Sequence, residues 1–83
     1  MIVTIRHLSA DSAQQIYNFI YTYCHIMTDH RPRVEKSSHD RYNITFEIDQ
    51  YIKMTTYEDM VCISSIDSVC KIPRWEFSEI TIM

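Results

Sequence analysis

The segment SAQQIYNFIYTYCHIMT, residues 12–28, decides the fold because it has a helical periodicity that the rest of the chain lacks. Its apolar side chains recur at helical spacing, which places them on one face of an amphipathic α-helix. These core-facing residues are Ile16, Phe19, Ile20, Tyr23 and Met27. Asp11 with Gln14 resembles a capping box at the start of the helix, and Ser9 is the alternative cap. The helix should end near Thr28, because a proline follows shortly after it.

The face of this helix that points away from the core has no formal charge, since the segment contains no Asp, Glu, Lys or Arg. A second row beside the core row consists of Tyr17, Tyr21, Cys24 and Thr28, and the remaining face has Gln14, Asn18, Thr22 and His25. Tyrosine combines a large contact area with a polar tip and is enriched at protein interfaces. The second row therefore predicts either a wider core or a docking surface, for another protein or for a second copy of the chain.

Outside the helix the period changes to two, which is typical of β-strands. Strands are predicted over residues 2–7, 33–37, 41–48, 51–57, 60–66 and 75–83, whereas residues 67–73 are ambiguous. A helix followed by a run of strands indicates the α+β class. We expect a single helix in the N-terminal half, packed on an antiparallel sheet of about five strands in the order β-α-β-β-β-β-β. The first and last strands are expected in the middle of that sheet.

Length and composition place the chain among small ordered proteins. Its 83 residues predict a single domain spanning residues 1–83, and association would add to the stability of so small a core. A hydrophobic content of 46% with a net charge of −3 argues against disorder. The three cysteines are an odd number, and we find neither a secretion signal nor an apolar run that could span a membrane. We therefore expect a cytoplasmic, reducing location with free thiols.

The chain contains no glycine. Loops that cradle phosphate groups need the positive φ and the close backbone approach that glycine allows. The absence of glycine therefore excludes a P-loop, a dinucleotide-binding fingerprint and a G-x-S-x-G nucleophile elbow in this sequence. The turns are expected to use Asn, Asp, His and Ser, whose side chains form local hydrogen bonds to the backbone.

Basic side chains concentrate in residues 30–41, which hold Arg31, Arg33, Lys36 and Arg41, four of the eight Lys and Arg residues. Positive charge just after a helix complements its C-terminal dipole, which alone accounts for Arg31 and Arg33. As a functional feature, the segment is suited to an acidic protein surface or to the phosphates of RNA. Aromatic residues are sparse around it, and Tyr42 and Phe46 are expected in the core, so RNA is the second choice.

Groups for catalysis or metal binding give weak patterns. His25 and Asp29 are four residues apart at the helix end, with His30 beside them, but no fourth ligand is in view. Cys24 and His25 are neighbours on a helix and point in different directions, so they cannot pair as thiolate and imidazole. We therefore expect no catalytic residues, no metal and no cofactor.

The sequence thus predicts a small non-enzymatic protein-binding module. The composition fits a virus- or phage-encoded inhibitor that occupies a surface of a host protein or complex. The candidate partner-binding residues are Tyr17, Tyr21, His25, Arg31, Arg33, Lys36 and Arg41. A homodimer through the uncharged helix is a further expectation, and the alternative function is nucleic-acid binding or RNA processing through residues 30–41.

Overall fold

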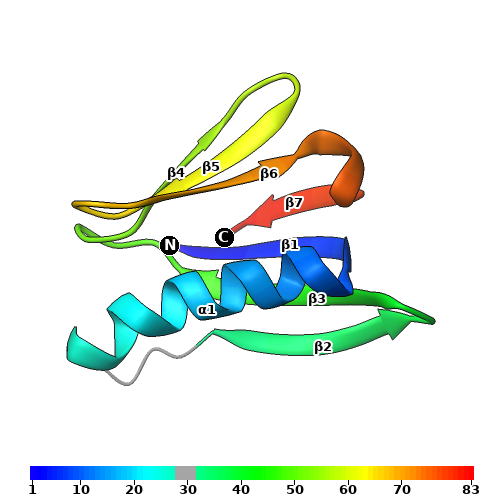
Figure 1. Ribbon diagram of the computed structural model, residues 1–83, viewed down its shortest axis with the longest axis horizontal. Coiled ribbons are helices and arrows are strands. Elements are labelled where there is room, and N and C mark those ends of the chain that lie inside the picture. Colours follow the sequence, from blue (N-terminus) through cyan, green and yellow to red (C-terminus); the bar gives the residue numbers. More distant parts are fainter. Residues whose placement is uncertain (28–31) are drawn as a thin grey trace.

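The computed structural model describes residues 1–27 and 32–83, with the backbone alone for 23–27. The elements are β1 (Ile2–Ser9), α1 (Ala10–Met27), β2 (Arg33–Ser38), β3 (Arg41–Glu47), β4 (Lys53–Thr56), β5 (Met60–Ser64), β6 (Val69–Pro73), the 3-10 helix η1 (Arg74–Glu76) and β7 (Glu79–Ile82). Figure 1 shows α1 lying across one face of the strands, with the two chain ends close together. The expected α+β class, with a helix on antiparallel strands, is confirmed.

Four strands form the sheet under α1, in the order β2-β3-β1-β7, and each neighbouring pair is antiparallel. Ile5 lies opposite Ile44, so apolar side chains form rows across the sheet on its helix side. The buried residues of this half of the core are Val3, Ile5, Leu8, Ala13, Ile16, Ile20, Ile44 and Phe46. Burial of each large aliphatic or aromatic side chain among them contributes roughly 1.5–3 kcal/mol, which holds the helix to the sheet.

A bulge in β1 keeps the core side of that strand apolar. The register with β3 shifts between Ile5 and Leu8, and His7 has a left-handed φ of 63°. The backbone N–H of His7 donates to Asn43 Oδ1 at 3.0 Å. The extra residue shifts the alternation, so Leu8 lies on the buried side together with Val3 and Ile5.

The helix begins at Ala10, directly after Ser9. Ser9 Oγ accepts a hydrogen bond from the backbone N–H of Ser12 at 3.2 Å, as an N-cap side chain does. The alternative cap is therefore confirmed, and the expected capping box of Asp11 and Gln14 is wrong, because both residues already lie inside the helix.

The expectation of one sheet of about five strands is wrong, since the described residues form seven strands in two sheets. The chain leaves the first sheet at Asp49, whose carboxylate accepts hydrogen bonds from the N–H groups of Tyr51 at 2.7 Å and Ile52 at 3.0 Å. This local turn redirects the chain, and β4, β5 and β6 then form a separate antiparallel sheet. The inner residues of the second sheet complete the core and are Val61, Ile63, Cys70 and Ile72.

The expectation of one strand over residues 75–83 is wrong in its first half, because η1 comes first and β7 begins at Glu79. The guanidinium of Arg74 donates to the backbone oxygens of Phe77 at 2.8 Å and Ser78 at 3.0 Å. These bonds hold the chain in a tight turn where a strand was expected.

The C-terminal residues pair within a sheet, as expected, because β7 is antiparallel to β1. Met83 and Ile2 exchange two backbone hydrogen bonds, both of 2.8 Å. Only one of the two terminal strands lies in the middle of the sheet, however: β1 is an inner strand and β7 is an edge strand.

The turns form without glycine, as the composition predicts. The hairpin between β2 and β3 turns through Asp40, whose φ of 61° is left-handed, a region that Asp tolerates better than most residues. Between β5 and β6, Ser65 closes the turn through its backbone N–H, which donates to the oxygen of Ser68 at 2.9 Å.

Candidate protein-binding site

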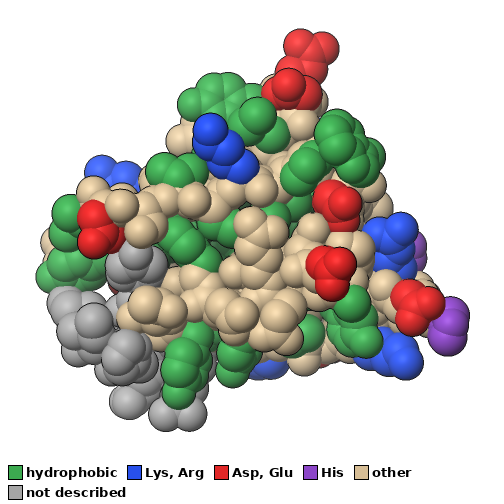
Figure 2. Space-filling view, viewed as in Figure 1, with side chains coloured by type: hydrophobic (Ala, Val, Ile, Leu, Met, Phe, Trp, Pro, Cys, Tyr) green, Lys and Arg blue, Asp and Glu red, His purple; other side chains and the backbone are tan. Residues whose placement is uncertain are grey.

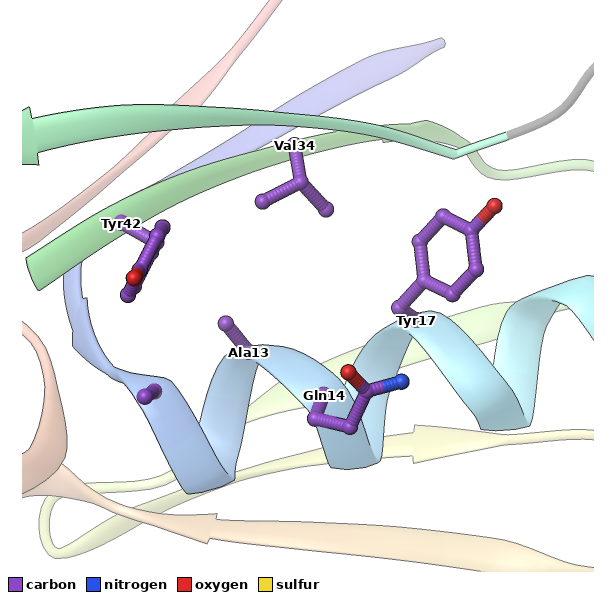
Figure 3. A pocket seen from close by; sticks show the side chains of 6 residues that line it. Ala13, Gln14, Tyr17, Val34 and Tyr42 are labelled. Atoms are coloured by element: carbon purple, nitrogen blue, oxygen red, sulfur yellow. The ribbon is translucent and has the colours of Figure 1, made fainter.

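A hollow opens between α1 and the edge strand β2, on the helix side of the four-stranded sheet (Figure 3). Its volume is about 380 Å³, and it is lined by Ala10, Ala13, Gln14, Tyr17, Val34 and Tyr42. Figure 3 shows Val34 and Tyr42 projecting from the strands toward the helix, and Tyr17 projecting toward the strands. Alanine is too small to bridge this space, so the helix leaves the side chains of the edge strand partly uncovered.

Tyr17 and Tyr21 extend one wall of the hollow along the helix. Their rings stack with centroids 5.8 Å apart and an angle of 13° between the planes, a contact that the spacing of four residues allows. Tyr17 is half-buried and packs against the core, whereas Tyr21 is 39% exposed. The second helix row thus widens the core at one tyrosine and supplies accessible surface at the next.

The outward face of α1 satisfies its polar groups with neutral neighbours. Gln14 Nε2 donates to Asn18 Oδ1 at 2.9 Å, and the hydroxyl of Thr22 donates to the backbone oxygen of Asn18 at 2.7 Å. In Figure 2, which views this side of the molecule, a tan band of backbone and uncharged polar side chains runs along the middle, with acidic side chains at its right-hand end and hydrophobic ones below it. Beyond Asp11 in the first turn, this face can be covered by a partner without leaving an unpaired charge buried.

The strand beside the hollow is exposed along its whole length. All six residues of β2 are exposed, including Val34 at 40%. β2 is bonded to β3 on one side, and it ends the sheet on the other. Its sequence of Arg33, Val34, Glu35 and Lys36 includes charges, which edge strands commonly use to discourage indiscriminate pairing.

The described basic residues that the sequence analysis proposed, Arg33, Lys36 and Arg41, do not gather on one face. Arg33 lies opposite Thr45 and Lys36 lies opposite Tyr42. Because side chains alternate along a strand, Lys36 is on the helix side near the hollow, and Arg33 is on the open face. Arg41 is near Glu76, whose carboxylate it helps to stabilise.

Of the other predicted partner-binding residues, Tyr17 and Tyr21 lie together at the hollow. Arg31 and the side chain of His25 lie outside the described residues, as do Asp29 and His30 of the metal hypothesis. The structure therefore brings the two tyrosines and Lys36 to one side of the sheet and separates Arg33 from them.

Sequence reasoning missed Val34 and the two alanines, and it assigned Tyr42 to the core. Tyr42 is half-buried and also lines the hollow. An apolar residue between two charges, as in Arg33-Val34-Glu35, was the available signal for Val34. No sequence pattern identifies Ala10 and Ala13 as lining residues, because the space that they leave open depends on how closely the helix approaches β2.

At the start of α1, a cluster of the Glu76 carboxylate and the hydroxyls of Ser9 and Ser12 serves the fold. Glu76 of η1 accepts hydrogen bonds from the hydroxyls of Ser9 and Ser12, the latter at 3.0 Å. These two hydrogen bonds, together with the positive charge of Arg41, hold the pKa of Glu76 below its ordinary value. The cluster links η1 to the helix N-terminus, where a negative charge is favourable.

Two of the cysteines are described, Cys62 and Cys70, and both are free thiols. Burial, and to a smaller extent the neighbouring Cys62, raises the pKa of Cys70 to about 11. Cys70 is therefore a protonated packing residue at neutral pH. Among the described residues, no group of three or more His, Cys, Asp or Glu side chains is placed to hold a metal ion, and no helix is both long and apolar enough to cross a membrane.

Comparison with known proteins gives no relative: no family model, no curated protein and no solved structure matches this chain. The geometry and chemistry of the site are therefore the basis for a functional proposal.

Proposed function

We propose that this chain is a non-enzymatic protein-binding module that holds an apolar segment of a partner protein in the hollow between α1 and β2. The observation that carries the proposal is the hollow itself, about 380 Å³ in volume and lined by two tyrosines, a valine and two alanines. Apolar and aromatic linings with a few polar groups are typical of binding sites. The volume is sufficient for one or two large side chains.

The positive charge of Lys36, on the strand side of the hollow, favours a partner segment with an acidic residue at that side. Lys36 is on the helix side of β2, next to Val34 along that face of the strand. A carboxylate flanking the bound apolar side chain would lie close to the Lys36 ammonium, which gives orientation and faster association more than affinity.

Holding a partner without changing it covalently is the action of an inhibitor or an adaptor. That such an inhibitor is virus- or phage-encoded and acts in the cytoplasm belongs to the proposal and rests on composition. Nucleic-acid binding stays the alternative prediction, and the separation of Arg33 from Lys36 does not favour it, because phosphate binding gains from convergent cations.

The proposal can be tested by selecting peptides from a random displayed library against the purified chain. We expect the enriched peptides to combine a large apolar residue with Asp or Glu. In fluorescence anisotropy, Tyr17→Lys and Val34→Lys should each weaken binding of a selected peptide by about tenfold or more, because each buries a charge in the hollow.

The matched control is Tyr57→Lys, which makes the same change at a tyrosine that is 53% exposed. Tyr57 lies in the turn between β4 and β5, outside the elements that line the hollow. The affinity of Tyr57→Lys should equal that of the unchanged protein. Circular dichroism of each variant checks that the fold is intact. Selected peptides that bind Tyr17→Lys and Val34→Lys as tightly as the unchanged chain would rule out the hollow as the site.

A further inference from the structure

The backbone groups at the free edge of β2 can be identified from the hydrogen bonds elsewhere in the sheet. Ile2 exchanges both of its backbone bonds with Met83, so alternate residues of β1 bond to β7 and the others bond to β3. Ile5 is among the residues that bond to β3, and it lies opposite Ile44. On β3, Ile44 therefore bonds to β1, and its neighbours on either side bond to β2.

Those neighbours are Asn43 and Thr45, which lie opposite Glu35 and Arg33. Glu35 and Arg33 thus direct their backbone groups toward β3, and Val34 and Lys36 direct theirs out of the sheet. No hydrogen bond to these outward groups is found among the described residues. The edge therefore offers a row of donors and acceptors that another strand can use.

We propose that a second copy of this chain pairs with β2, antiparallel, across a two-fold axis that passes beside Val34. In this register Val34 lies opposite Val34 of the second copy, and the two residues exchange two backbone hydrogen bonds. The axis is perpendicular to the sheet, so the two four-stranded sheets join into one continuous sheet with both helices on the same side.

Charge complementarity favours this register over those centred on the neighbouring charged residues of β2. Arg33 lies opposite Glu35 of the second copy, and Glu35 lies opposite Arg33, so two pairs of opposite charge form on the open face. Within one copy, neither residue has an ion-pair partner among the described residues. An axis beside Glu35 would place two glutamates opposite each other, and an axis beside Lys36 would do the same with two lysines, both of which are unfavourable.

Pairing through β2 would leave the hollow of each copy accessible. Because the axis preserves the faces of the sheet, the two hollows lie on the same side, next to the joined β2 strands. Each hollow remains open toward the helix side, since the second copy adds to the strand edge and not to the helix. The dimer therefore does not depend on the proposed function, and either can fail while the other holds.

The seam is small. In this register only residues 33–35 of the two β2 strands lie opposite each other, so the seam covers much less than the roughly 1,200 Å² that is typical of stable complexes. We therefore expect a weak dimer whose population changes with concentration, best measured by sedimentation equilibrium across a hundredfold range of protein concentration.

The test is a charge reversal followed by a charge swap. Glu35→Arg places Arg33 opposite an arginine of the second copy and should weaken the dimer by about tenfold or more, because like charges face each other twice. The double variant Arg33→Glu with Glu35→Arg restores opposite pairs in the same register and should recover the dimer. Glu58→Arg, an equal charge change at an exposed residue outside β2, is the matched control and should leave it unchanged.

A chain that stays monomeric over the whole range would overturn the proposal. So would a dimer that is equally strong in the unchanged chain and Glu35→Arg, or a double variant that remains as weak as Glu35→Arg. A dimer that is weakened by Tyr21→Glu and not by Glu35→Arg would place the interface on the uncharged helix and contradict pairing through β2. Thermal unfolding of each variant separates loss of the dimer from loss of the fold.

Discussion

The two edge strands of the four-stranded sheet differ in how much of their own chain covers them. In β7, Ile80 packs against the core, and Glu79 forms an ion pair with Arg6 at 3.6 Å. The strand is also tied at both ends, by the turn that Arg74 holds and by the bonds of Met83 to Ile2. In β2, by contrast, all six residues are exposed, and the space between the strand and α1 is not filled.

Both strands present outward backbone groups, but β7 is packed and tied to the rest of the chain more firmly than β2. The helix contacts β3 most extensively, and Ile80 of β7 also packs against the core, whereas every residue of β2 is exposed. Stability should therefore depend on the β7 side, whereas contacts with other molecules should depend on the β2 side. A pair of matched truncations separates these two roles.

The largest difference between the edges is expected when Ile80 and Val34 are each changed to alanine. Ile80→Ala removes a half-buried side chain from the core and should lower the free energy of unfolding by about 1–2 kcal/mol. Val34→Ala, at a residue that is 40% exposed, should lower it by about 0.5 kcal/mol or less. Urea unfolding followed by circular dichroism measures both, and equal losses would contradict the difference between the edges.

A smaller effect is expected at Glu76, which joins η1, at the β7 side, to the start of α1. Its pKa in the folded state is below the ordinary value of 4.5, so its ionised form stabilises the fold above that pH. This contribution should be lost as the pH falls through the lower folded pKa. Glu76→Gln should therefore be less stable than the unchanged chain at pH 7, and the difference should shrink in acid.

The measurement is the unfolding midpoint in urea at several values between about pH 7 and pH 3, where carboxylates gain their protons. Glu58→Gln, at an exposed residue of the turn between β4 and β5, is the control and should follow the unchanged chain. A difference between Glu76→Gln and the unchanged chain that does not vary with pH would show that the charge of Glu76 has no part in the effect.

Much of the local structure could be predicted from the sequence. The helix and the strands β1, β3, β4 and β5 have clear periods, and their predicted ranges overlap the observed ones. The break between η1 and β7 was not predicted, although the apolar positions change phase between Phe77 and Ile80. The turn itself depends on two hydrogen bonds from Arg74, which periodicity does not indicate. The bulge at His7 also depends on a distant residue, Asn43.

Neither the division of the strands into two sheets nor the hollow could be predicted from the sequence, for a related reason. Each strand has suitable residues for pairing, and nothing local states which strands become neighbours. The tyrosine row of α1 indicated a contact surface, but Val34 joins it only because β2 lies beside the helix. The partner-binding role of these residues stays a prediction.

The chain is expected to meet other molecules along β2 and not along β7, and a pair of proline variants distinguishes the two edges. Val34 directs its N–H out of the sheet at one edge, and Ile82, between Thr81 and Met83, directs its N–H out at the other. Proline at such a residue removes only an outward donor, which an edge strand tolerates.

We would measure the mass of the unchanged chain, Val34→Pro and Ile82→Pro by sedimentation equilibrium at matched concentrations. If β2 is the interface, the unchanged chain and Ile82→Pro form the same concentration-dependent dimer, and Val34→Pro is a folded monomer. A dimer that persists in Val34→Pro, or that is lost in folded Ile82→Pro, would contradict it.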